Sequence, residues 1–182
     1  MSPSTHEMWT LELSPGSLGK LVESPVPSGT ARFRVEFGRL NRLIEFRAPG
    51  GPPPTPVDFL RARDRTSLVA APFSPPLLQL GPSWICEMRT YQYQPGHMKE
   101  VLQIWEPLIP GRVEVSPLFA CFTHESGNAD TLIHIWAYEG FMDRERAKEA
   151  FKTRKGWPPP TFQWLHSQEN CIIAPTSRWL SP

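Results

Sequence analysis

This 182-residue chain lacks several features that would identify a common class of protein. It has no run of 18 apolar residues, and its first residues have neither the basic nor the apolar segment of a signal peptide. It also has no basic run free of acidic residues, and its formal net charge is only +1. We therefore expect a cytoplasmic protein with no membrane span and no nucleic-acid partner.

Recognisable cofactor motifs are absent as well. The sequence contains no nucleotide-binding loop, nucleophile elbow, haem motif or flavin fingerprint. His124, His134 and His166 have no metal-site spacing with carboxylates or thiols. We expect no metal and no cofactor, so that any chemistry must rest on side chains.

Cysteine is scarce. Cys86, Cys121 and Cys171 are odd in number, widely spaced and embedded in apolar or strand-like sequence. This pattern predicts reduced, buried thiols rather than a disulfide framework or a zinc site. A catalytic thiol is the alternative, but nothing nearby in the sequence favours a thiolate.

Proline, by contrast, is abundant, with 22 residues. It cannot continue a helix or a central strand, so its clusters mark loops and the ends of elements. The clearest clusters are Pro52-Pro53-Pro54, Pro75-Pro76 and Pro158-Pro159-Pro160. The 40% of apolar residues is otherwise ordinary for a globular protein.

An internal repeat organises the chain. Residues 7–16 (EMWTLELSPG) recur as residues 87–96 (EMRTYQYQPG), a shift of 80 (87 minus 7). Residues 41–46 (NRLIEF) recur as 130–135 (DTLIHI), a shift of 89 (130 minus 41). The ending Ala71-Pro72-Phe73-Ser74-Pro75 is echoed by Ala174-Pro175 and Ser181-Pro182. The pattern indicates a tandem duplication.

Hydrophobic periodicity assigns similar elements to both halves. In the first half it predicts strands over 8–13, 31–37 and 43–47, and helices over 17–23 and 57–70. In the second half it predicts strands over 85–93, 118–124, 131–138 and 168–173, and helices over 97–105 and 143–154. Asp143 is the expected N-cap of the last helix, and Ala147, Ala150 and Phe151 are expected to face the core. The orders βαββα and βαββαβ predict an α+β protein of two ferredoxin-like repeats whose sheets pack face to face.

Three ordered motifs carry a family resemblance: Glu87 to Tyr91 with Pro95-Gly96, residues 130–138, and Ser167 to Asn170. Over residues 85–182 the chain resembles a NIPSNAP domain, and the first copy resembles it more weakly. The resemblance implies a dimeric α+β barrel formed within one chain by a degenerate repeat (6–82) and a second repeat (83–182). It also implies that further self-association is weak. Some family members are implicated in mitochondrial or vesicle-linked signalling, and barrel relatives include small enzymes of aromatic and polyketide metabolism.

Strand alternation gathers the candidate functional residues. Glu87, Arg89, Tyr91 and Tyr93 share one face of their strand, as Leu132, His134, Trp136 and Tyr138 do on theirs. If these faces coincide, they form an acid/base pocket in which His134 moves a proton near neutral pH, Arg89 holds an anion or enolate, and Tyr91 donates to a carbonyl oxygen. We predict His134, Arg89 and Tyr91 as catalytic residues. The predicted substrate-binding residues are Glu87, Tyr93, Trp105, Trp136 and Tyr138.

The same residues allow a structural interpretation, in which Glu87 and Arg89 form an ion pair and His134 is a hydrogen-bonded core residue. The first copy has Trp9 at the position of Arg89 and Glu45 at that of His134, and we interpret this half as having lost the polar set. Two functions remain open. One is a cofactor-independent acid/base enzyme for cyclisation, isomerisation or C–C cleavage of a small aromatic or polyketide-like metabolite. The other is a non-catalytic small-molecule-binding or protein-interaction module.

Overall fold

The computed structural model describes residues 4–22, 26–51, 54, 58–77, 80–81, 83–153 and 156–176. Period-2 alternation explains its strands: in β2, Ala31, Phe33 and Val35 are buried, whereas Arg32 and Arg34 between them are half-buried. The elements of the first half are β1 (Thr5–Leu13), α1 (Leu18–Val22), β2 (Ala31–Phe37), β3 (Arg42–Arg47) and β4 (Leu60–Ala70).

The second half has longer helices, and its strand β7 is buried at every position. A strand buried on both faces needs a core on each side of the sheet, and helices supply the second one. The elements of this half are β5 (Ile85–Tyr93), α2 (Met98–Trp105), η1 (Glu106–Leu108), α3 (Ile109–Val113), β6 (Leu118–His124), β7 (Thr131–Tyr138), α4 (Phe141–Lys152), η2 (Phe162–Trp164) and β8 (Leu165–Pro175).

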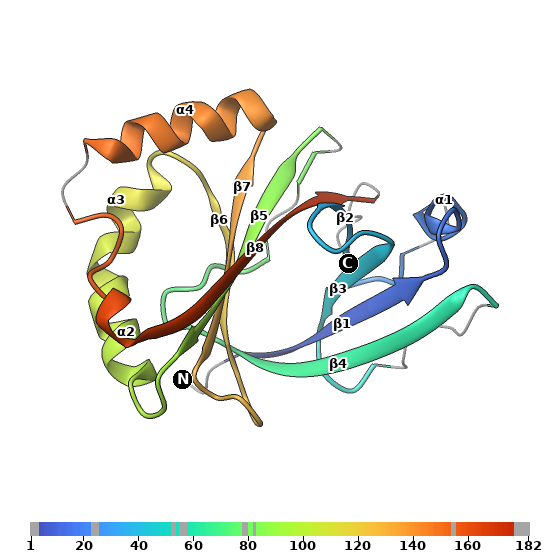
Figure 1. Cartoon of the computed structure of the whole chain (residues 1–182), viewed down its shortest axis with the longest axis horizontal. Coiled ribbons are helices and arrows are strands. Elements are labelled where there is room, and N and C mark those ends of the chain that lie inside the picture. The colour runs from blue at the N-terminus through green and yellow to red at the C-terminus, as the bar shows by residue number, and fades with distance from the viewer. Residues whose placement is uncertain are drawn as a thin grey trace.

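All eight strands form one closed barrel in the order β1-β3-β2-β8-β5-β7-β6-β4 (Figure 1). Strands of the first half are neighbours in the order β4-β1-β3-β2, and those of the second half in the order β8-β5-β7-β6. The two groups join where β2 pairs with β8 and where β4 pairs with β6. The chain therefore has a mixed α/β fold, rich in strands and with few helices.

Apolar side chains from both halves fill the interior of the barrel. Phe46 of β3 stacks on Phe122 of β6 with 5.8 Å between ring centroids. Phe33 of β2 meets Phe119 of β6 edge to face at 5.2 Å. Because these contacts cross from one half to the other, both halves share a single core.

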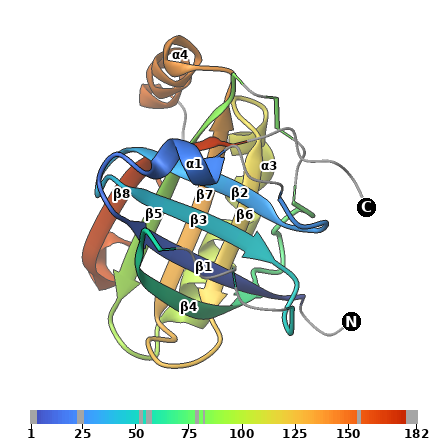
Figure 2. The same ribbon diagram turned by 90° about the vertical axis from the view of Figure 1, so that its right-hand side faces the viewer.

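Helices cover the outer faces unequally. Figure 1 places α2, α3 and α4 against the side of the barrel formed by the second half, and α1 on the opposite side. Figure 2 shows α1 lying across the strands of the first half. Val101 and Trp105 of α2 and Ala147 of α4 are buried against the outer face of the second half. This second core, between sheet and helices, contains the site described below.

The helix expected over 57–70 is wrong, because residues 60–70 form strand β4. β4 pairs antiparallel with β1 from Thr5↔Val69 to Leu13↔Leu60. Arg61, Arg63 and Arg65 occur at every second position, a spacing that puts them on one face of a strand but spreads them around a helix.

The other expected elements are present, with small shifts at their ends. The last helix begins at Phe141 with Gly140 as N-cap, so Asp143 is not the N-cap. The Asp143 carboxylate still accepts a hydrogen bond of 3.2 Å from the backbone N–H of Glu139. Ala147 is buried as expected, whereas Ala150 is exposed. Parts of the predicted pattern lie outside the described residues: Glu23, Pro52, Pro53, Val57, Arg154 and the final Ser181-Pro182.

The three cysteines are free thiols, as predicted. Cys86 and Cys121 are buried, and Cys171 is half-buried. Burial raises the pKa of the Cys171 thiol to about 11, with a further contribution from the charge of Glu169. A thiol with a raised pKa is a poor nucleophile, so this cysteine does not support a catalytic role.

Candidate functional site

The register of β5 on β7 brings the predicted polar residues together. Arg89 lies directly opposite His134, and Glu87 lies opposite Trp136. These side chains face outward from the barrel, towards α2 and α4, and not into its interior. The two strand faces therefore coincide, as the sequence suggested.

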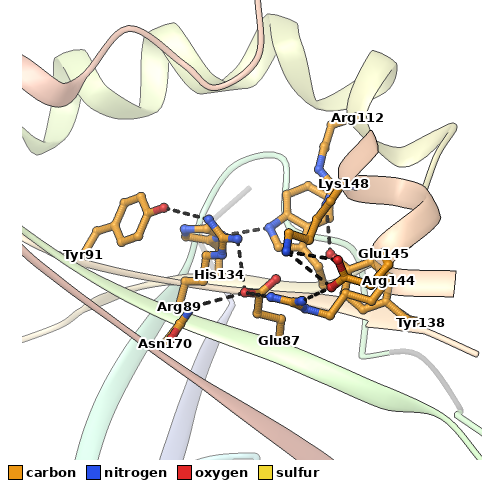
Figure 3. A network of polar contacts seen from close by, with 11 residues as sticks. Glu87, Arg89, Tyr91, Arg112, His134, Tyr138, Arg144, Glu145, Lys148 and Asn170 are labelled. Atoms are coloured by element: carbon orange, nitrogen blue, oxygen red, sulfur yellow. Dashed lines mark hydrogen bonds and ion pairs between the residues drawn. The ribbon is translucent and has the colours of Figure 1, made fainter. Parts of the chain in front are cut away.

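Glu87 is the centre of a buried hydrogen-bond network (Figure 3). Its Oε1 accepts from Arg144 Nη2 at 2.8 Å, from Arg89 Nη2 at 3.1 Å and from Asn170 Nδ2 at 3.3 Å. Burial alone would raise the pKa of Glu87, but the hydrogen bond from Arg144 and the charges of both arginines outweigh it and lower the pKa. Glu87 is thus an ionised carboxylate that orients Arg89.

Arg89 in turn orients Tyr91. Arg89 Nη1 donates to the Tyr91 hydroxyl oxygen at 3.2 Å. A phenol that accepts a hydrogen bond at its oxygen keeps its own proton free to donate to another group. The Tyr91 ring also meets the His134 ring edge to face, with 4.7 Å between centroids. Arg89, Tyr91 and His134 therefore form one contiguous cluster.

His134 is buried and holds a defined tautomer. Its Nδ1 accepts a hydrogen bond of 2.8 Å from Trp136 Nε1, so a neutral imidazole carries its proton on Nε2. Burial, and then the charges of Arg89 and Arg112, place the His134 pKa well below its ordinary value. The expectation that His134 moves a proton near neutral pH is therefore corrected. This histidine is a neutral hydrogen-bond donor at neutral pH.

Arg112 is a site residue that the sequence interpretation missed. It lies on α3, is 5% exposed, and its Nη2 donates to the Tyr138 hydroxyl at 3.1 Å. Its guanidinium lies 3.9 Å from the Trp136 ring centroid and 4.0 Å from that of Phe151. Burial lowers the pKa of Arg112 to about 10, which leaves it charged at neutral pH.

A signal for Arg112 was present in its spacing. Trp105, Ile109 and Arg112 are all buried and recur at i, i+4 and i+7, the spacing of a core-facing helical stripe. Pro110 and Gly111 within this stretch argued against a continuing helix. The chain resolves this conflict by breaking the helix into α2, η1 and α3.

A cavity of about 60 Å³ opens beside these groups. Five of the predicted site residues line it: Arg89, Tyr91, Trp105, His134 and Trp136. The predicted residues Glu87, Tyr93 and Tyr138 do not line it. The remaining lining residues are Arg112, Phe151, Trp157, Pro158, Pro159, Thr161 and Phe162.

The three predicted residues outside the cavity support its walls. Glu87 positions Arg89, and Tyr138 positions Arg112. Tyr93 forms a hydrogen bond of 3.0 Å with Thr161 Oγ1, which also accepts from Trp105 Nε1 at 3.4 Å. These contacts fix the orientation of groups that face the cavity.

The first half places a different polar network on the corresponding strands. Glu45 and Arg47, at the positions of His134 and Trp136, are both buried and form an ion pair. Arg32 Nε lies 2.7 Å from Glu45 Oε1, and Trp9 Nε1 donates to Glu7 Oε2 at 3.0 Å. This half therefore lacks the arginine, tyrosine and histidine of the second half, as we interpreted from the sequence. It has replaced them with ion pairs that satisfy one another.

Two further properties concern the described residues alone. Within them, no three His, Cys, Asp or Glu side chains are grouped so that they could hold a metal ion. Over the same residues, none of the helices has the length and apolar character needed to cross a membrane.

Comparison with known proteins identifies relatives of the second half. The NIPSNAP family model matches residues 86–179. Protein NipSnap of Drosophila melanogaster is 31% identical over 124 residues, which are 65% of this chain and 44% of that protein. NipSnap homolog 2 of Homo sapiens is 31% identical over 122 residues, 65% of this chain and 42% of the relative. The chain thus spans less than half the length of these relatives.

A solved structure matches the whole barrel. A candidate monooxygenase from Lactobacillus acidophilus NCFM superposes with a TM-score of 0.67, covering 97% of this chain and 95% of that one, at 8% sequence identity. At so low an identity the likeness concerns the fold alone. Because the family model covers half of the sequence, the chain belongs to the NIPSNAP family.

Proposed function

We propose that the cavity of the second half binds a small aromatic or polyketide-like carbonyl compound and promotes its deprotonation without a cofactor. One observation carries this proposal: Tyr91 and His134 line one cavity beside Arg89, and His134 Nε2 is a buried donor with no partner among the described residues. Donors held in place near a carbonyl oxygen stabilise the negative charge that develops there.

The step can be written with its proton and electrons accounted for. A C–H bond next to the ligand carbonyl breaks, and its electron pair moves to the carbonyl oxygen to give an enolate. Tyr91 and His134 donate hydrogen bonds to that oxygen, and the positive charge of Arg89 stabilises the negative charge of the enolate. The proton passes to water at the mouth of the cavity, because no carboxylate is among the described residues that line it.

The aromatic walls favour a planar apolar ligand. Trp105, Trp136 and Trp157 line the cavity, and Trp157 meets the other two edge to face at 5.5 Å and 5.6 Å. Rings in this arrangement offer flat apolar surfaces, and they exclude water from the donors. Both properties suit an aromatic or polyketide-like compound whose enolate charge must be stabilised.

We infer further that the barrel arose from two ferredoxin-like repeats, residues 6–82 and 83–182. Both halves have the strand order 4-1-3-2 when their strands are numbered within the half. The pair Glu7↔Arg47 of the first half corresponds to Glu87↔Trp136 of the second at the shifts of 80 and 89 residues. Both β1 and β5 also have an irregularity at the same position, before Leu13 and before Tyr93.

Proton exchange measures the proposed step directly. Aryl methyl ketones are incubated with the protein in D₂O, and loss of the methyl proton signal is followed by NMR. Tyr91→Phe and His134→Gln should each slow the protein-dependent exchange roughly 100-fold, the usual effect of losing one oxyanion donor. His166→Gln is the matched control, because His166 is exposed on β8 and does not line the cavity.

The outcome separates this function from its alternative. Exchange that proceeds equally fast in Tyr91→Phe and His134→Gln would contradict the proposed roles of these residues. Ligand binding without any protein-dependent exchange would instead favour a non-catalytic binding module.

A further inference from the structure

Arg112 is a buried cation without an acidic partner among the described residues. Its hydrogen bonds go to the neutral hydroxyls of Ser116 and Tyr138, and its Nε has no partner there. Its guanidinium is covered on its flat surfaces by the rings of Trp136 and Phe151. Burying an unpaired charge is costly, so an arginine retained in this setting calls for an anionic partner.

Arg112 contrasts with two half-buried arginines near it. Arg144 contacts both Glu87 and Glu145, at 2.8 Å and 2.7 Å. Arg89 contacts Glu87 at 3.1 Å. Each of these two arginines has a carboxylate in direct contact, whereas Arg112 has none among the described residues.

The unpartnered polar atoms at the cavity are all donors. Arg112 Nε, Arg89 Nε and His134 Nε2 are buried and have no hydrogen-bond partner among the described residues. All three belong to residues that line the same cavity. A guanidinium N–H can only donate, and His134 accepts at its other nitrogen. The complementary ligand therefore presents acceptor oxygens with negative charge.

We propose that the ligand of this site carries a carboxylate, and that Arg112 binds it. This inference rests on the proposed function, in which the carbonyl oxygen of the same ligand lies against Tyr91 and His134. The substrate class is then a small oxo or aromatic carboxylic acid.

Geometry favours a carboxylate over other anions. The planar fork of a guanidinium matches the two oxygens of a carboxylate, and the Trp136 and Phe151 rings hold that fork in a fixed plane. The cavity of about 60 Å³ accepts an acid group and a few more atoms. Larger parts of a ligand would lie near Phe162, which is 52% exposed at the rim.

Pairs of probes that differ only in charge test this inference. Pyruvate is compared with pyruvamide, and benzoate with benzamide, by tryptophan fluorescence, because three tryptophans line the cavity. The carboxylates should bind at least roughly tenfold tighter than the amides, as expected for one charge-assisted interaction. Inorganic phosphate, a tetrahedral anion, should bind more weakly than either carboxylate.

Variants assign the preference to Arg112. Arg112→Gln should bind acid and amide about equally, and Arg112→Lys should recover part of the preference because it restores charge without the planar fork. Arg146→Gln is the matched control, since Arg146 is exposed on α4 and does not line the cavity. It should keep the full preference.

Each result bears on the proposal. Equal binding of acids and amides by the unmodified protein, tightest binding of phosphate, or no binding of either carboxylate at millimolar concentrations would overturn it. A preference that survives in Arg112→Gln would overturn the role of Arg112. If Arg112→Gln does not fold, the preference for acids over amides is still tested by comparing the unmodified protein with Arg112→Lys. A carboxylate preference without proton exchange on ketones would reject the deprotonation chemistry and leave carboxylate binding in place.

Discussion

At one equivalent position of each half, the two halves have different buried polar residues. Glu45 of the first half is 1% exposed and contacts Arg32 and Arg47, so its charge is already balanced within the protein. His134 of the second half is also buried, but its Nε2 has no partner among the described residues. The second half thus has an unsatisfied donor where the first has a satisfied ion pair.

Glu87 holds the donor cluster in place, and its loss should be measurable as a pH-dependent loss of stability. We expect Glu87→Gln to lower the free energy of unfolding by about 2–3 kcal/mol at pH 7, because Arg89 and Arg144 lose a buried charged partner. The pKa of Glu87 is lower in the folded protein than in the unfolded chain. Its contribution to stability is therefore fully present above about pH 4.3, the pKa of a glutamate in the unfolded chain. This contribution to stability is lost as the pH falls through the pKa of Glu87 in the folded protein.

Urea denaturation at pH 7 and pH 3 checks this expectation. The difference between Glu87→Gln and the unmodified protein should be large at pH 7 and smaller at pH 3. Glu149→Gln is the control, because the Glu149–Lys152 pair is exposed and such pairs contribute little. An equal effect of Glu87→Gln at both pH values would show that its charge does not stabilise the fold.

At the scale of elements, strand β4 differs from the others in how it pairs with its neighbours. It pairs with β1 along nearly its whole length but with β6 only from Leu68 to Ala70. In an antiparallel pair, the N–H groups of alternate residues point to the same neighbour. Between Leu60 and Thr66, only every second amide of β4 can therefore bond to β1.

Hydrogen exchange should reveal this pattern. We expect alternating slow and fast amide exchange over residues 60–66, and uniformly slow exchange in the middle of β1, which has neighbours on both sides. Residue-resolved exchange measured by NMR is the test. Continuous protection over 58–70 would indicate a helix and contradict the strand.

The sequence predicted elements well where one periodicity dominates. Strands 31–37, 85–93, 118–124 and 131–138 have the bounds expected from alternation. β4 was missed because residues 61–65 are exposed on both faces of the strand, so this stretch has no alternation of apolar and polar residues. For the site, alternation alone brought Arg89 and His134 together, because cross-strand faces follow from the pleat.

The remaining features of the site depend on packing between elements, which cannot be predicted from the periodicity of a single strand. Arg112 comes from a short helix interrupted by proline and glycine. The protonation of His134 depends on burial beneath α2 and on two arginines from different elements. The balanced ion pairs of the first half likewise depend on partners from β2 and β3.

At the scale of the whole molecule, the shared interior makes the two halves interdependent. Phe46 and Phe122 stack across the barrel, so separating the halves would expose the apolar inner face of each. We expect residues 1–82 and 83–182, expressed separately, to be unfolded or to self-associate through these faces. Circular dichroism with light scattering checks this, and two folded, monomeric halves would contradict it.

The full chain should not need a partner copy to cover its sheet. The inner faces that could drive dimerisation already meet within one closed barrel. We expect light scattering to give the mass of a monomer at micromolar concentration, with weak association at most. A stable dimer that dissociates when Phe46 or Phe122 is changed to Ala would show that the faces pair between chains instead.

The protonation of His134 tests the donor cavity most directly. Nitrogen-15 NMR of the imidazole reports which nitrogen carries the proton. Between pH 5.5 and 8 we expect His134 to stay neutral, protonated at Nε2 and unprotonated at Nδ1, because burial and two neighbouring cations disfavour the imidazolium. Benzoate should shift the Nε2–H signal, and benzamide should shift it less. An imidazolium at pH 6.5, or an Nε2–H signal that no carboxylate alters, would contradict a cavity built to hold an anion.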